Sequence, residues 1–162
     1  MKKIVLVAIS ASLFFVACKK DDSLPDPNNN NNNNNNTSTT LTSGSWKMVS
    51  STSVIEYPAP VGTQTVDLFA LMQPCVKDNL YIFKTDNTTV SDEGATKCNS
   101  SDPQQKTAGT WALINNNTKL QITENSTSIT ADILTLNSST LELRYVTTYG
   151  GMNSTTTTKY TH

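Results

Sequence analysis

From residue 41 onward, apolar side chains occur in short runs that are separated by clusters of Ser, Thr, Asn and Gly. The clearest run alternates: Leu141, Leu143 and Tyr145 fall on one face of an extended segment. Glu142 and Arg144 lie between them and fall on the other face. A period of two residues indicates strand, and its recurrence between turn clusters predicts an antiparallel meander.

We expect about eight strands joined by tight turns. They cover residues 45–55, 79–84, 88–92, 107–114, 119–123, 127–136, 140–149 and 154–161. One short helix is expected, over residues 67–73. Asn115-Asn116-Asn117 and Gly150-Gly151 suit backbone conformations with positive φ, so both segments predict hairpin turns.

The predicted fold class is therefore all-β. An up-and-down barrel of about eight strands removes its edges by closing on itself, which favours that architecture for a meander. A two-sheet β-sandwich is the alternative, because the period of a strand does not show whether a sheet closes.

The first residues have a different pattern. Lys2 and Lys3 precede an almost wholly apolar segment, residues 4–16, which as a helix would span about 20 Å. This length is too short for a hydrocarbon core of about 30 Å. The pattern predicts a signal peptide over residues 1–17, not a membrane span.

The end of this segment, Phe15-Val16-Ala17-Cys18, resembles the lipobox of bacterial lipoproteins. The resemblance implies that Cys18 becomes the first residue of the mature chain and carries a diacylglycerol and a further acyl chain such as palmitate. Several acyl chains together would hold the protein at a membrane. The alternative is an ordinary signal peptide with an incidental cysteine.

The residues behind Cys18 resemble address and modification motifs. Lys20, Asp21 and Asp22 are similar to the export signal of surface lipoproteins in the Bacteroidetes. Ser23 lies in a segment that resembles their O-glycosylation site. These resemblances imply an outer-membrane lipoprotein of the cell envelope that faces outward. The alternative is a polar linker that carries no export or glycosylation signal.

Residues 18–40 predict a disordered, Asn-rich tether. Pro25 and Pro27 interrupt regular structure, and Asn28–Asn36 offers no apolar side chain that would offset the entropy of ordering. The tether separates the anchor from a single domain over residues 41–162, which is long enough to form a core.

A family resemblance extends over that domain. Gly44-Ser45-Trp46 is similar to the Gly-x-Trp motif of lipocalins, and the block from Cys75 to Cys98, followed by Gly109-Thr110-Trp111, resembles the lipocalin-like domain of Bacteroidetes lipoproteins. The resemblance implies a barrel whose closed end is covered by Trp46. In lipocalins an arginine packs on this tryptophan. Arg144, the single arginine, could make this cation–π contact, or it could lie on a solvated face beside Glu142.

Cys75 and Cys98 remain once Cys18 is assigned to lipid. An oxidising envelope compartment favours their pairing as a disulfide, since a predicted hairpin brings them to the same end of the domain. No CxxC spacing is present, and His162 is the single histidine, so no metal site is expected.

Composition argues against several functions. A net charge of −1 with one arginine disfavours nucleic-acid binding. No histidine is placed beside a candidate nucleophile, and no glycine-rich phosphate loop is present. We therefore expect a monomer that is not an enzyme and that uses no cofactor.

Two functional classes remain. The first is a barrel that binds a small apolar ligand, and the second is a surface module that contacts another macromolecule through its loops and has no cavity. For the first class the candidate ligand-binding residues are the inward apolar and aromatic ones, which could equally form a packed core: Tyr81, Phe83, Trp111, Leu113, Leu143, Tyr145 and Tyr149.

Overall fold

The computed structural model of the protein describes residues 31–162. The predicted signal peptide over residues 1–17 lies outside the described residues. So do Cys18, Lys20, Asp21, Asp22 and Ser23, for which lipidation, export and glycosylation are predicted. These assignments therefore stay predictions.

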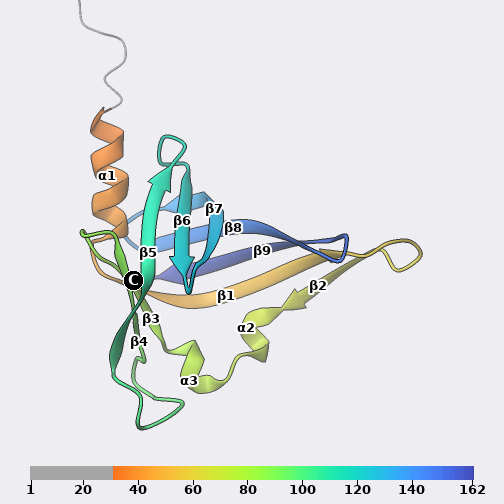
Figure 1. Ribbon diagram of the computed structural model, residues 1–162, viewed down its shortest axis with the longest axis horizontal. Helices are drawn as coiled ribbons and strands as arrows, with labels where there is room; N and C mark the ends of the chain where they lie inside the picture. Colours follow the sequence, from red (N-terminus) through yellow and green to blue (C-terminus); the bar gives the residue numbers. More distant parts are fainter. Residues whose placement is uncertain (1–30) are drawn as a thin grey trace, which may run out of the picture.

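One antiparallel sheet forms the body of the described chain, with a helix before it and two short helices on one side (Figure 1). The helices are α1 (Asn31–Leu41), α2 (Leu68–Leu71) and α3 (Pro74–Lys77). The strands are β1 (Ser45–Glu56), β2 (Thr63–Asp67), β3 (Leu80–Phe83), β4 (Thr88–Asp92), β5 (Gln105–Ile114), β6 (Lys119–Glu124), β7 (Thr127–Leu136), β8 (Thr140–Tyr149) and β9 (Met152–Thr161).

The sheet closes because β1 pairs with strands from both ends of the order β2-β1-β3-β4-β5-β6-β7-β8-β9. Along one edge β1 pairs with β9, from Lys47↔Thr161 to Glu56↔Asn153. Along its other edge β1 pairs first with β3 and then with β2. The result is a closed barrel of eight strands with β2 as an additional strand, so the predicted all-β up-and-down barrel is confirmed over the sandwich.

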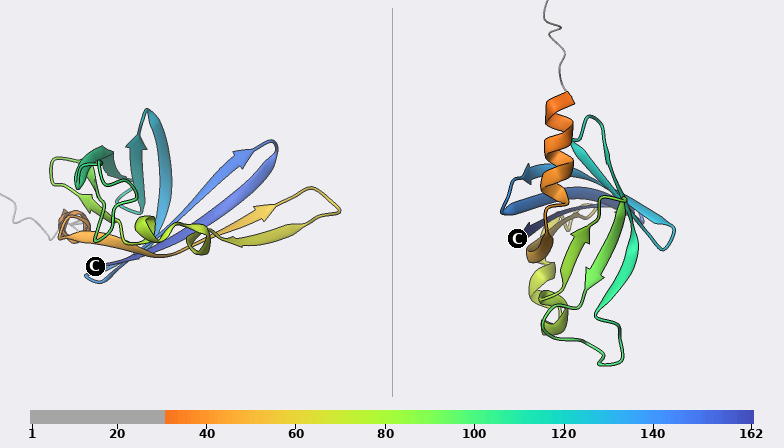
Figure 2. Two further views of the ribbon diagram at one scale, coloured as in Figure 1. Left: turned by 90° about the horizontal axis from the view of Figure 1, so that it is seen from below. Right: turned by 90° about the vertical axis from the view of Figure 1, so that its left-hand side faces the viewer.

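The pairing of β7 with β8 covers only part of these strands. It runs from Leu136↔Leu141 to Asp132↔Arg144 and then ends. Thr127–Ala131 continue to pair with β6, and Tyr145–Tyr149 continue to pair with β9. The β6–β7 and β8–β9 hairpins therefore diverge, as the left view of Figure 2 shows, and the barrel wall opens between them.

The turn predictions are confirmed where the sequence carries Asn or Gly. Asn115, Asn116 and Asn117 have φ angles of 51°, 54° and 64°, and Gly150 and Gly151 have φ angles of 58° and 78°. These left-handed conformations are the ones that two-residue and three-residue hairpin loops require.

The helix expected over residues 67–73 is shorter in the structure. Asp67 ends β2 and caps α2, since its Oδ1 accepts a hydrogen bond of 2.9 Å from the backbone N–H of Ala70. Pro74 then begins a separate helix, α3, at a position where its missing N–H costs nothing. β2 (TQTVD) is mostly exposed and polar, which explains why the apolar pattern does not predict it.

Helix α1 differs from the tether expected over residues 18–40, because the described part of that segment is helical up to Leu41. Its last turn is held by polar contacts: Thr42 Oγ1 donates to the Ser38 carbonyl over 3.0 Å, and Ser43 Oγ donates to the Thr40 carbonyl over 2.8 Å. Leu41 is fully buried against the barrel. Because Leu41 is the one apolar residue in α1, the sequence of this segment has no helical period of apolar residues that would predict the helix.

Trp46 covers the end of the barrel beside α1. Its side chain is fully buried, and its indole N–H donates to the carbonyl oxygen of Leu41 over 2.9 Å. The imidazole of His162 packs on it, with the two ring centroids 3.9 Å apart. Gly44 leaves the space for this contact, since a Cβ at that position would lie 2.6 Å from Cε1 of His162.

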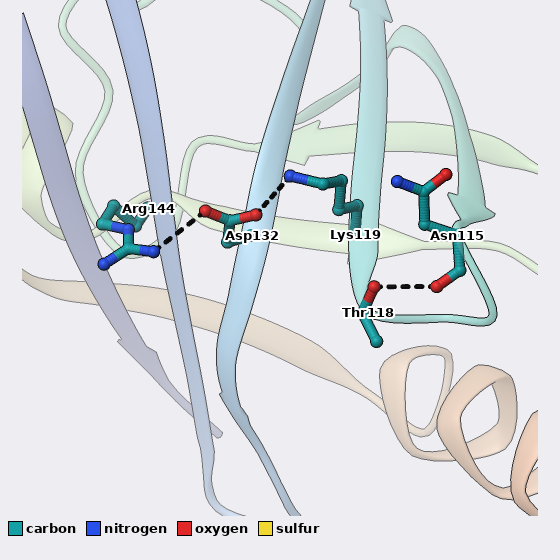
Figure 3. A network of polar contacts seen from close by, with 5 residues as sticks. All are labelled: Asn115, Thr118, Lys119, Asp132 and Arg144. Atoms are coloured by element: carbon teal, nitrogen blue, oxygen red, sulfur yellow. Dashed lines mark hydrogen bonds and ion pairs between the residues drawn. The ribbon is translucent and has the colours of Figure 1, made fainter.

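Arg144, for which a contact with Trp46 or a solvated position is predicted, lies on the outer face of β8. Its guanidinium Nη2 pairs with Asp132 over 3.1 Å, and the ammonium of Lys119 pairs with the other carboxylate oxygen (Figure 3). Hydrogen bonds from Lys119 and then from Arg144 lower the pKa of Asp132. The group that packs on Trp46 is therefore the imidazole of His162, and Arg144 takes the solvated position, the second of its two expected ones.

The predicted disulfide is confirmed. Cys75 in α3 is bonded to Cys98 in the loop that follows β4, across a sequence separation of 23 residues. The bond ties the helical segment between β2 and β3 to the long β4–β5 loop.

We expect the C75A/C98A double variant to lose roughly 3 kcal/mol of unfolding free energy, because the cross-link restricts a long loop of the unfolded chain. Urea unfolding measures the loss. Under reducing conditions the wild-type protein should unfold at the same urea concentration as the variant. Equal stability of both proteins under oxidising conditions would contradict the expectation.

The contact between Gly44, His162 and Trp46 predicts a coupled pair of substitutions. Gly44→Ala should lower the unfolding free energy by about 1 kcal/mol, because the new methyl group displaces the imidazole from Trp46. In a His162→Ala background the same substitution should cost much less, which a double-mutant cycle measures. An equal cost in both backgrounds would show that the imidazole is not what Gly44 accommodates.

Candidate functional site

A cavity of about 480 Å³ lies inside the barrel, next to the opening between β7 and β8. Its apolar lining comes from strands β1, β6, β7 and β8 and from the α2 segment, which contributes Leu68 and Met72. The other apolar lining residues are Met48, Leu120, Ile122, Ile129, Ala131 and Leu143. Ile129 keeps 42% of its surface exposed, so the cavity reaches the solvent on this side.

Strand alternation places these side chains. On β6, Leu120 and Ile122 point to the same face as Glu124, because they are two residues apart. Leu120 is paired with Ala131 and Ile122 with Ile129 on β7, so the two strands form one continuous apolar wall.

Three tyrosines and one carboxylate are among the polar residues that line the cavity. Tyr81 on β3 donates a hydrogen bond from its hydroxyl group to Oε1 of Glu124 over 3.3 Å. Its ring meets the ring of Tyr160 edge to face, with centroids 6.3 Å apart. Tyr145 on β8 lines the same cavity.

Burial and charge raise the pKa of two of these phenols, Tyr81 and Tyr160. Burial, followed by the charge of Glu124, raises the pKa of Tyr81 to about 12. Burial is also the main reason that the pKa of Tyr160 is raised, with further contributions from Tyr81, Tyr145 and Glu124. Tyr81 and Tyr160 therefore carry their protons at physiological pH and can act as hydrogen-bond donors.

Strands β1 and β9 meet through buried hydroxyl groups. Ser51 and Thr158, which both line the cavity, share a hydrogen bond of 3.0 Å. Farther along the same strands, Ser53 bonds to Ser154 over 2.6 Å. These hydroxyls satisfy one another, so the Thr-rich last strand forms a stable inner wall although it offers little apolar area.

Some of the predicted ligand-binding residues line the cavity and others do not. Tyr81, Leu143 and Tyr145 line it. Phe83 and Trp111 are buried core residues that meet edge to face with centroids 5.9 Å apart, and Leu113 packs against that core. Tyr149 is 85% exposed at the end of the β8–β9 hairpin.

Met48, Glu124 and Tyr160 are among the lining residues that are not predicted from the sequence. Glu124 lies one residue beyond the predicted strand 119–123, and it alternates with Leu120 and Ile122. Extending that alternation by one residue would have found it.

The other candidate chemistry concerns metal ions and carboxylates. Within residues 31–162, no group of three or more His, Cys, Asp or Glu side chains is arranged to hold a metal ion. Asp92, the carboxylate next to Glu93, holds the β4–β5 loop: it accepts hydrogen bonds from Gln105, Gln104 and the backbone of Gly94, which lower its pKa. No helix in this part of the chain is long and apolar enough to cross a bilayer.

Comparison with known proteins gives one result. A family model described as the lipocalin-like domain matches residues 42–143, from Thr42, three residues before β1, to Leu143 in β8. A search of curated proteins finds no match. The match covers more than half of the chain and ends inside a barrel that β9 completes. The chain therefore belongs to the lipocalin-like domain family.

Proposed function

We propose that this protein binds a small, largely apolar molecule inside its barrel and does not act on it as an enzyme. The observation that carries the proposal is the cavity of about 480 Å³, which falls in the range of about 300–1,000 Å³ that is typical of small-molecule sites. Proteins of the lipocalin-like family are in general binding proteins, which supports the same conclusion.

The lining supports an apolar ligand. Leu120 and Leu143 are almost completely buried at the base of the cavity, while Ile129 is partly exposed at its opening. When an apolar molecule enters, its own apolar surface and that of the lining are both removed from water. This favours binding by about 25 cal/mol per Å² of apolar surface buried.

The opening between β7 and β8 offers a route to this site. The backbone groups of Thr127–Ala131 and Tyr145–Tyr149 pair with β6 and β9 respectively and not with each other. A ligand can therefore reach the interior between the two hairpins without breaking the pairing of the sheet.

We further propose that Cys18 anchors the domain to the outer membrane, with Lys20, Asp21 and Asp22 directing it to the cell surface. The support for both proposals is the lipobox-like Phe15-Val16-Ala17-Cys18 and the polar segment behind it.

A surface module that contacts another macromolecule through its loops is the second candidate function. Val61 and Tyr149 favour it, since they are 57% and 85% exposed near the ends of the β1–β2 and β8–β9 hairpins. It becomes the better account if no apolar molecule binds.

We expect an apolar probe, dodecanol below its solubility limit, to bind saturably, and Leu143→Trp to weaken that binding at least about tenfold by filling the cavity. Isothermal titration calorimetry is the measurement, because neither Trp46 nor Trp111 lines the cavity. Leu134→Trp is the matched control, since Leu134 is 44% exposed and does not line the cavity. Equal binding by both variants would argue against a site in the barrel.

For the anchor, Cys18→Ala should move the protein from the membrane fraction to the soluble fraction, because the lipid-accepting thiol is lost. Mass spectrometry of the wild-type mature N-terminus should show acyl chains. Replacing Asp21 and Asp22 with alanine should leave the lipid in place and protect the domain from protease added to intact cells. Membrane association without lipid at Cys18 would refute the anchor.

A further inference from the structure

We propose that the apolar ligand carries an ammonium group, and that this cation lies between the carboxylate of Glu124 and the rings of Tyr81, Tyr145 and Tyr160. The inference rests on the proposed function and names the chemical class of ligand that the same cavity takes.

Charge is the first argument. Among the residues that line the cavity, Glu124 is the only charged side chain, and no lysine, arginine or histidine is present. Both ion pairs of the described residues involve Asp132 on the outer face of the barrel, so neither neutralises Glu124. A ligand with a carboxylate would bring a second negative charge into this space, which partial burial makes costly.

Hydrogen-bonding capacity is the second argument. Tyr81 donates to Oε1 of Glu124, and this is the hydrogen bond that the described side chains make to the carboxylate. An ionised carboxylate can accept about four hydrogen bonds. Glu124 therefore retains acceptor capacity, and an ammonium group supplies the opposite charge and, where its nitrogen carries hydrogens, the donors.

The aromatic rings are the third argument. Tyr81, Tyr145 and Tyr160 come from three different strands and line one cavity with Glu124. The rings of Tyr81 and Tyr160 lie 6.3 Å apart edge to face, and the Tyr81 hydroxyl lies 3.3 Å from Oε1 of Glu124. Clustered aromatic rings attract cations through their π faces, and protein cages for quaternary ammonium groups use this arrangement.

The remaining lining suits the rest of such a ligand. Leu120, Ile122 and Leu143 line the same cavity as the tyrosines, and Met72 contributes to the lining from the α2 segment. The unbranched Met72 side chain can adapt to ligands of different shape. A cationic head with an apolar body matches this division of the cavity into a polar and an apolar part.

The experiment compares probes that share a dodecyl chain and differ in the head group: dodecylamine, dodecyltrimethylammonium, dodecanol and dodecanoate, each below its micelle concentration at pH 7. Calorimetric titration of the domain should show both cations binding at least about tenfold more tightly than dodecanol, with dodecanoate the weakest.

Two variants and one control locate the effect. Glu124→Gln keeps the shape and a hydrogen-bond acceptor for Tyr81, and it should remove the preference for the cations while dodecanol binds within about twofold of wild type. Tyr145→Leu should weaken binding of the trimethylammonium probe more than binding of dodecanol. Glu56→Gln is the matched control, because Glu56 is an exposed residue at the end of β1 and does not line the cavity.

The outcomes separate the two proposals. Binding of dodecanoate that equals or exceeds binding of the cations, or a cation preference that survives Glu124→Gln, would overturn the ammonium site and leave the apolar site standing. If none of the four probes binds to the folded wild-type protein, the proposed function fails, and the inference built on it fails as well.

Discussion

Strand β1 pairs with three other strands, and the shape of the barrel depends on how these pairings divide its length. One edge is occupied by β9 from Lys47 to Glu56. The other edge is shared: β3 takes residues 45–47, and β2 takes residues 52–56. Near Trp46 the sheet therefore closes into a barrel, whereas toward Glu56 the strands β2, β1, β9 and β8 continue outward as a projecting sheet (Figure 1).

This division also separates the packed core from the cavity. At the closed end, Trp46, Phe83, Trp111 and Leu141 fill the interior, and the indole N–H groups of both tryptophans find backbone acceptors, at Leu41 and Lys84. Farther along, the pairing between β7 and β8 ends beyond Asp132 and Arg144. The cavity lies at this transition, so that a rigid core supports one side of it. A barrel of this size can thus be filled at one end and open at the other.

Local patterns predict the features that depend on neighbouring residues. Alternation on β8 places Leu143 and Tyr145 inside, the Asn115–Asn117 turn follows from side chains that tolerate positive φ, and the Cys75–Cys98 bond follows from the two ends of one hairpin. Contacts between distant residues leave no such pattern. The packing of His162 beside Gly44 joins the two ends of the domain, and the polar β2 is held by its register with β1 and not by apolar burial. Glu124 is a different case within the site: it lies one residue beyond a predicted strand, and the alternation of Leu120 and Ile122 continues to it.

The gap between Thr127–Ala131 and Tyr145–Tyr149 has a kinetic consequence. Many barrels and lids admit a ligand only after backbone hydrogen bonds break or an element swings away, and such motions take microseconds to milliseconds. Here the two hairpins are already apart, and the groups at the entrance are side chains, among them the partly exposed Ile129 and Tyr145. Rotation of exposed side chains takes picoseconds to nanoseconds. Exchange of a molecule through this gap would therefore be limited by diffusion and by release from the lining. Opening of the sheet would add no slower step.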